Sequence, residues 1–170
     1  VIQPAVRRAV AATRNGKVGV IGTQTTIDSR AYVDAFAAAP QLQITSVACP
    51  LFVSYVERGE TSGQEILKIA QGYLKPIIEA EVDTLVLGCT HYPLIKPQID
   101  AYYKGSIPVI DTSIIVADEI KRILQAEDML HAGSESSRQF FVSDYTDSFE
   151  KSTQIFFGKA IKLTQYPIWD

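Results

Sequence analysis

The stretch 84–88 constrains the fold more than any other part of this sequence. Its three middle residues are Leu, Val and Leu, Gly88 ends it, and Cys89 follows directly. A strand with one face in water alternates apolar and polar residues, whereas an unbroken apolar run is typical of a parallel strand covered on both faces. We therefore expect residues 84–88 to form a central strand with Cys89 at its C-terminal end.

The rest of the chain alternates between short apolar runs and longer segments whose apolar residues have helical spacing. These patterns predict further strands at 18–22, 43–49, 107–110, 139–143 and 160–164, and helices at 27–36, 51–57, 62–80, 94–103, 114–130 and 147–157. The longest of these helices, 62–80, has one apolar stripe, and Pro76 is expected to kink it. Alternating strands and helices predict an α/β fold, with a mainly parallel sheet flanked by helices and joined by right-handed crossovers.

The composition is that of an ordinary globular protein and excludes two classes of partner. Of the 170 residues, 46% are hydrophobic and 21% are charged, and the formal net charge is -3. No apolar run reaches the roughly 18 residues that a membrane helix needs. Lys and Arg do not gather into a stripe that would hold nucleic-acid phosphates. We therefore expect a soluble protein that binds neither a membrane nor nucleic acid.

The two cysteines, Cys49 and Cys89, are too few for a disulfide framework. The chain opens at Val1 rather than Met, and its first residues lack the basic start and apolar stretch of a signal peptide. We expect a cytoplasmic protein with two free thiols, and a sequence that has been cropped upstream.

Polar side chains follow the predicted strands at the points where the strands end. The first four strands are followed by residues 23–26, Cys49, residues 89–91 and residues 111–113, which are almost all Thr, Ser, Cys, His or Asp. In open α/β sheets, ligands bind outside the carboxyl ends of the strands. We therefore expect the functional site at this edge of the sheet.

Cys89 is the candidate reactive residue at this edge. Gly88 is expected to let the chain turn sharply, so that the thiol points out of the sheet with Thr90 and His91 within reach. A thiol beside a helix N-terminus and an imidazole can have a lowered pKa, which favours the thiolate that acts as a base or nucleophile.

Simpler interpretations of these residues remain open. Cys89 could be a small buried apolar side chain, and the surroundings of Cys49 favour that interpretation for the second cysteine. Cys89 and His91 also form half of a zinc site, but no second Cys/His pair follows at ligand spacing, so we expect no metal. The threonines could be ordinary helix caps, and Glu57 could be a solvated surface charge.

Six consecutive residues resemble the segment around the second catalytic cysteine of glutamate racemases, namely Gly88, Cys89, Thr90, His91, Tyr92 and Pro93. Other segments resemble the family's landmarks in the same order, at 20–27, 48–57, 109–111 and 141–144. His91 favours glutamate over aspartate racemases, which tend to carry an acidic residue at this position. Ser54 and Tyr55 depart from the Pro-Leu that is common in the family. The resemblance covers nearly the whole chain.

This resemblance implies that the protein interconverts L- and D-glutamate without pyridoxal phosphate or metal, and so supplies D-glutamate for peptidoglycan. It implies that Cys89 is one of two thiols that exchange the α-proton on opposite faces of the substrate. The implied substrate-binding residues are Thr90, His91 and Thr26, with Thr23 as a further carboxylate contact and Glu57 as the residue that orients His91.

The family's N-terminal segment, with its Asp-Ser-Gly-Val-Gly-Gly motif and the Cys-Asn-Thr that carries the first thiol, has no counterpart in this sequence. Family members have two similar α/β domains with the active site between them, and their C-terminal stretch completes the first domain. By that pattern, residues 1–111 are the second domain and residues 112–170 are part of the first. We therefore expect the chain alone to be catalytically incomplete, and a homodimer stays open. A non-catalytic α/β module that binds a small carboxylate or a partner chain, or a related aspartate racemase, is the alternative.

Overall fold

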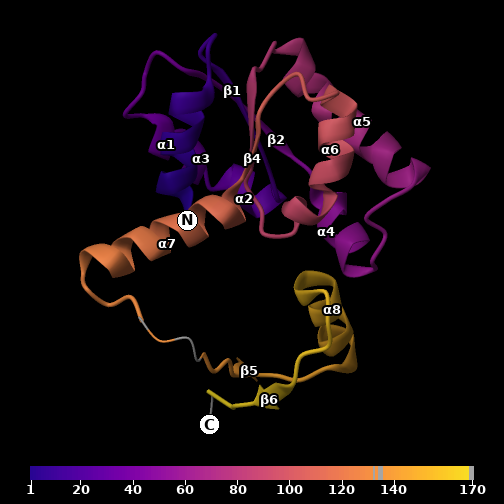
Figure 1. Cartoon of the computed structure of the whole chain (residues 1–170). Coiled ribbons are helices and arrows are strands. Elements are labelled where there is room, and N and C mark those ends of the chain that lie inside the picture. The colour runs from indigo at the N-terminus through magenta and orange to yellow at the C-terminus, as the bar shows by residue number, and fades with distance from the viewer. Residues whose placement is uncertain (132, 134–135, 169–170) are drawn as a thin grey trace.

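The computed structural model describes residues 1–131, 133 and 136–168 (Figure 1). Four parallel strands form its central sheet in the order β2-β1-β3-β4. Their bounds are Lys17–Gly22 for β1, Gln43–Ala48 for β2, Thr84–Leu87 for β3 and Val109–Asp111 for β4. Ile21 of β1 pairs with both Val47 and Leu87, so these strands end at one common edge. The α/β fold with a mainly parallel sheet is confirmed.

Helices cover both faces of this sheet (Figure 1). One face carries α1 (Ile2–Ala12) and α3 (Ala31–Phe36), and the other carries α4 (Pro50–Glu57), α5 (Gln64–Glu79), the 3-10 turn η1 (Tyr92–Ile95) and α6 (Lys96–Tyr103). The short helix α2 (Gln24–Asp28) follows β1 at the C-terminal edge. The central strand β3 is therefore covered on both sides, as its unbroken apolar run predicted.

Side chains of the strands alternate between the two faces and build two apolar clusters. On β1, Val20 packs under α1 and α3, whereas Ile21 packs under the helices of the other face. On β3, Val86 packs under α1 and α3, whereas Leu85 and Leu87 pack under the helices of the other face. All five side chains are fully buried. Because burying one such side chain stabilises a fold by about 1.5–3 kcal/mol, β1 and β3 form the most firmly held part of the sheet.

Helix α7 (Thr112–Ala126) leaves the end of β4 and packs on α1. Asp111 caps it, since its carboxylate accepts an N–H of the first turn at 2.9 Å. Arg7 of α1 donates to Glu119 of α7 at 2.8 Å, and Ile115 packs into the cluster beneath α1. The first half of α7 is therefore tied to the central sheet.

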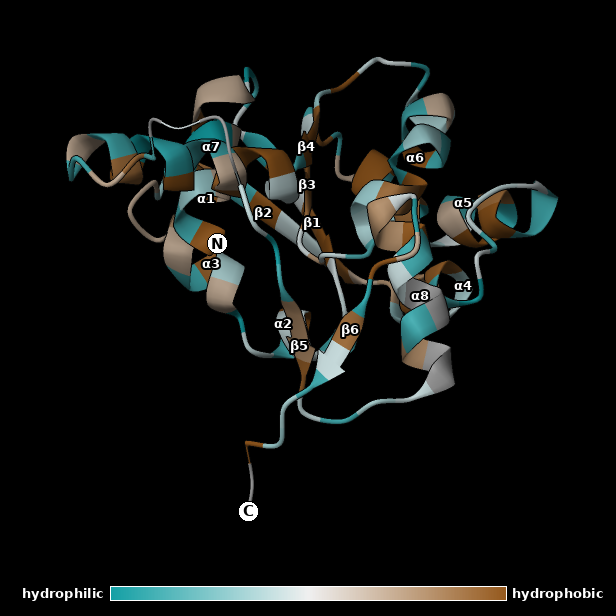
Figure 2. Ribbon diagram, turned by 60° about the horizontal axis from the view of Figure 1, so that its bottom comes forward, coloured by the Kyte–Doolittle hydropathy of each residue, from teal (hydrophilic) through white to brown (hydrophobic). Residues whose placement is uncertain are grey.

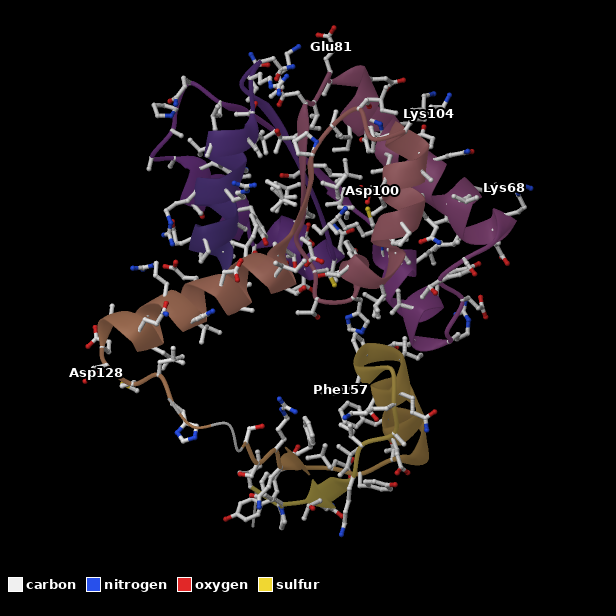
Figure 3. All side chains as sticks on the ribbon, in the orientation of Figure 1. Lys68, Glu81, Asp100, Lys104, Asp128 and Phe157 are labelled. Atoms are coloured by element: carbon white, nitrogen blue, oxygen red, sulfur yellow. The ribbon has the colours of Figure 1, made fainter. Side chains whose placement is uncertain are left out.

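A second, smaller unit follows α7. It consists of β5 (Phe140–Val142), α8 (Asp147–Phe157) and β6 (Leu163–Gln165), and its two strands pair in parallel. Figure 3 shows Phe157 of this unit at the opposite end of the molecule from Glu81, which precedes β3. Phe156 makes an edge-to-face contact with His91, with ring centroids 5.1 Å apart. The smaller unit therefore meets the main body at the C-terminal edge of the sheet.

Hydropathy marks the central sheet as the main core. Figure 2 shows apolar residues on the central strands and also on the β5–β6 pair. Along α7, Ile114, Ile120 and Ile123 are 61%, 52% and 47% exposed. In the part of the chain that the structure describes, no helix is both long and apolar enough to cross a membrane.

Several elements differ from the expectations drawn from the sequence. The predicted helix 94–103 is divided into η1 and α6, the helix predicted at 114–130 spans Thr112–Ala126, and the last strand lies at Leu163–Gln165. Helix α1 was not expected, although Ala5, Val6 and Ala9 form a buried stripe along it. The predicted helix 27–36 is divided into α2 and α3, because Arg30 adopts a left-handed backbone conformation with φ of 56° between them. A non-glycine residue in that conformation interrupts the helical hydrogen bonds.

Candidate active site

Gly88 sets the point at which β3 ends and Cys89 begins. Its N–H donates to the carbonyl of Ile21 at 2.7 Å. A Cβ at residue 88 would lie 2.9 Å from that carbonyl oxygen and 3.0 Å from Cε2 of Tyr32. The chain bends at Cys89 directly after this residue, as expected, but the Gly88 backbone is not left-handed. Glycine is needed here because Tyr32 and the neighbouring strand fill the space of a side chain.

The Cys89 thiol is half-buried at this edge. Burial raises its pKa, and the backbone N–H groups of His91 and Tyr92, which favour the thiolate, offset only part of that rise. The lowered pKa expected from the sequence is therefore wrong, because lost hydration of the thiolate outweighs the two donors. At neutral pH the group is a thiol.

The imidazole of His91 lies beside this thiol. Its Nδ1 is 4.0 Å from Sγ of Cys89 and 3.4 Å from the hydroxyl oxygen of Thr90. Its Nε2 is 3.5 Å from Oε1 of Glu57, and the ring of Phe156 packs edge-on against it. A carboxylate near Nε2 favours the tautomer with its proton on that nitrogen, which leaves Nδ1 as an acceptor facing Thr90 and Cys89. The structure thus brings four of the residues named from the sequence together.

Thr23 and Thr26 stand at the end of the neighbouring strand β1. Thr23 caps α2, and its hydroxyl accepts the Thr26 N–H at 3.2 Å. The two hydroxyl oxygens lie 2.9 Å apart, and both residues are half-buried. The cap interpretation therefore holds, and among the described residues the Thr26 hydroxyl bonds only to Thr23. Because Ile21 pairs with Leu87, this loop and the one that carries Cys89 leave adjacent strands at the same edge.

The remaining polar residues at this edge are structural. Cys49 is fully buried, and burial, followed by the charge of Cys89, raises its pKa to about 12. Tyr92 donates to the Cys49 carbonyl at 2.9 Å, and Thr112 donates to the carbonyl of Leu87 at 3.0 Å. These bonds hold the ends of three strands in place around Cys89. The structural interpretation of Cys49 is confirmed.

A family model decides what kind of protein carries this arrangement. Residues 1–120 match the model described as Asp/Glu/Hydantoin racemase. The chain belongs to the Asp/Glu/hydantoin racemase family.

Individual relatives of this chain are glutamate racemases. Those of Mycobacterium avium and Mycobacterium tuberculosis are 48% and 50% identical to it over 167 and 163 residues, which is 95% of this chain in both cases. The matches cover 61% and 60% of those two proteins, so this chain spans about three fifths of their length.

Two solved glutamate racemases share the fold of this chain. Isoform RacE1 from Bacillus anthracis has a TM-score of 0.90 at 31% identity, covering 99% of this chain and 64% of that one. The enzyme from Francisella tularensis, solved in complex with D-glutamate, has a TM-score of 0.86 at 28% identity, covering 99% of this chain and 62% of that one. The recognition of a glutamate racemase relative from the segment around Cys89 is confirmed.

The structure adds one residue to the candidate site that the sequence did not suggest. Tyr32 of α3 is buried against Gly88, and the charge of Cys89 contributes to its raised pKa. No local motif marks it, because α3 brings it to the site only through packing on the sheet. Among the described residues, no group of three or more His, Cys, Asp or Glu side chains is placed to hold a metal ion.

Proposed function

We propose that the protein carrying this chain interconverts L- and D-glutamate without a cofactor, and that Cys89 is one of its two acid–base groups. The observation that carries the proposal is the environment of the Cys89 sulfur. Backbone N–H groups of His91 and Tyr92 favour its thiolate, His91 Nδ1 lies 4.0 Å away, and the whole stands at the C-terminal end of a central parallel strand. The proposed setting is the cytoplasm, where thiols stay reduced, and the proposed use of the product is peptidoglycan synthesis.

In the proposed reaction, the Cys89 thiolate takes the α-proton of one enantiomer, so that an S–H bond forms as the C–H bond breaks. A second group then gives a proton to the opposite face of the carbanion. In the reverse direction, the Cys89 thiol is the donor. An α-proton is far less acidic than a thiol, and a thiolate with a raised pKa is the stronger base. Burial of Cys89 therefore favours abstraction of the α-proton by the thiolate, at the expense of the ionised fraction.

Hydroxyl and imidazole groups at the same edge would bind the substrate. We propose that Thr90 and Thr26 donate to its carboxylates, with Thr23 as a further contact, and that His91 Nδ1 accepts a hydrogen bond from its ammonium group. Glu57 would position His91 through Nε2. The Glu57 side chain is 56% exposed, so this contact orients the ring and contributes little to stability.

The second acid–base group must face the substrate from the other side. Cys49 does not meet this requirement, because it is fully buried and its pKa is raised to about 12. We propose that the second group is supplied by a part of the protein other than these 170 residues.

Racemisation of L-glutamate by the protein that carries this chain tests the proposal, with circular dichroism as the readout. Cys89→Ser should lower the rate by about 10²- to 10⁴-fold, since a hydroxyl is a far weaker acid than a thiol. Cys49→Ala is the matched control and should retain the rate. Near-normal racemisation by the Ser variant would contradict the assignment of Cys89. Preference for L-aspartate, or binding of glutamate without racemisation, would contradict the proposed substrate or the activity.

A further inference from the structure

Tyr32 is a buried titratable side chain that the proposed mechanism does not use. It belongs to α3 and is 4% exposed. Its Cε2 and Cζ atoms lie 3.0 and 3.5 Å from the position that a Cβ would take at Gly88. Because Cζ carries the hydroxyl, that hydroxyl lies beside the end of β3, next to the residue that precedes Cys89.

The Tyr32 hydroxyl has no partner within the described part of the protein, since no described group hydrogen-bonds to it. The other tyrosine beside Cys89 is different, because Tyr92 donates to the carbonyl of Cys49 at 2.9 Å. The fully enclosed unsatisfied side-chain atoms of the described residues are Gln98 Oε1 and Tyr103 OH. The Tyr32 oxygen is not one of them, so it borders space that a ligand can reach. A largely buried hydroxyl without a partner is unfavourable, and a ligand that accepts its hydrogen bond would remove that cost.

The electrostatic surroundings make this hydroxyl a donor. Burial and then the negative charge of Cys89 raise the pKa of Tyr32, so the phenol keeps its proton at neutral pH. Cys89 is close enough for its charge to act on the phenol, but its sulfur is not hydrogen-bonded to it in the described structure. A group bound between the two could therefore contact both.

We propose that the Tyr32 hydroxyl donates a hydrogen bond to a carboxylate bound beside Cys89. This inference rests on the proposed function, in which Tyr32 becomes a further substrate-binding residue. It extends the site across the sheet, because Tyr32 comes from the α1 and α3 face, whereas Glu57 and the η1 turn belong to the other face.

Two alkylating reagents of similar size test the carboxylate contact of Tyr32, and the test does not require a racemisation assay. Iodoacetate carries a carboxylate and iodoacetamide is neutral, and with each reagent the Cys89 thiolate forms a C–S bond as iodide leaves. Both reactions need the thiolate, so the ratio of their rate constants is independent of the ionised fraction and reports recognition of the carboxylate. Cys49 is buried, with its pKa raised to about 12. Labelling should therefore occur at Cys89, which peptide mass spectrometry verifies.

For the wild-type chain, the ratio of iodoacetate to iodoacetamide rate constants should exceed the ratio for glutathione. Tyr32→Phe, which removes one oxygen atom, should lower the iodoacetate-to-iodoacetamide ratio of the chain about tenfold. This is the size expected for one hydrogen bond to a charged group. Tyr103→Phe is the matched control, because it also removes a partnerless buried hydroxyl but lies at the end of α6 away from η1. Its ratio should stay at the wild-type value.

An unchanged ratio in a folded Tyr32→Phe variant would overturn the proposal, as would an equal fall in Tyr103→Phe. Circular dichroism at the labelling temperature verifies that each variant is folded. A fall confined to Tyr32→Phe supports the carboxylate contact even if the protein racemises nothing, in which case the proposed function alone would fail.

Discussion

Two opposing influences act on the ionisation of Cys89. Burial disfavours the thiolate, and the N–H groups of His91 and Tyr92 favour it, with burial the larger. We predict that the rate of iodoacetamide labelling at Cys89 keeps rising with pH beyond the ordinary thiol value of 9, and that its midpoint lies above that of free cysteine. A midpoint at or below free cysteine would mean that the two donors outweigh burial.

The buried thiol of Cys49 leads to a second prediction, which concerns the stability of the fold at alkaline pH. Its pKa is raised to about 12 in the folded chain from an ordinary value of 9, so the unfolded chain loses the proton first. The stabilisation of the folded chain by the protonated Cys49 thiol is therefore complete below about pH 9 and is lost as the pH rises toward 12. Between pH 9 and 11, the free energy of unfolding should fall more steeply in wild type than in Cys49→Ala, by up to about 1.4 kcal/mol per pH unit. Denaturant titrations of the two proteins at several pH values give the two slopes, and equal slopes would contradict the prediction.

At the scale of the elements, two glycines should respond oppositely to the same substitution. In Gly88→Ala, the new Cβ would lie 2.9 Å from the Ile21 carbonyl oxygen and 3.0 Å from the Tyr32 ring. We predict that this overpacking destabilises the fold by about 1–3 kcal/mol. Gly72 lies on the exposed side of α5, where a Cβ would meet nothing within 4 Å. Gly72→Ala should therefore stabilise the fold by about 0.5–1 kcal/mol through helix propensity. Urea denaturation measures the free energy of unfolding of both variants. An unchanged free energy of unfolding in Gly88→Ala would show that β3 and α3 can move apart at little cost.

The strands and the longer helices could be predicted because their periodicity is local. The apolar run before Gly88 requires cover on both faces, and the stripe through α5 requires one packed face, whatever the rest of the chain does. The division between α2 and α3 could not be predicted, because it depends on the backbone of Arg30. Helix α1 was missed because small alanines contribute much of its buried stripe, which makes its apolar period weak in sequence.

The candidate site divides in a similar way between local and tertiary features. The proximity of Thr90 and His91 to Cys89 could be predicted, since they are consecutive and follow a strand end. The direction of the Cys89 pKa shift and the presence of Tyr32 could not, because both depend on how deeply α3 and the sheet bury this edge. Burial is a property of the packed molecule, and local motifs do not report it.

At the scale of the whole molecule, the chain consists of two unequal parts. The central sheet has helices on both faces, whereas β5 and β6 form a pair of their own with three residues in each strand. In the described residues of the smaller unit, Phe141, Phe156 and Phe157 are 56%, 40% and 49% exposed. We propose that residues 1–111 form one domain and residues 112–170 part of another. The contact of α7 with α1 and the family match to residue 120 place the start of α7 close to the domain formed by residues 1–111.

This division predicts a difference in hydrogen exchange that a matched pair of strands can reveal. Strands β4 and β5 both have three residues, but β4 pairs with the buried β3 in a four-stranded sheet, and β5 pairs only with β6. An isolated two-stranded pair is marginally stable in water, so amides of β5 should exchange at least about 100-fold faster than those of β4. The exposed side chains Ile114, Ile120 and Ile123 favour association, so light scattering must first establish a concentration at which the chain is monomeric. Equal protection of β4 and β5 in that monomer would show that the smaller unit is stable by itself, and the proposed domain division would then be wrong.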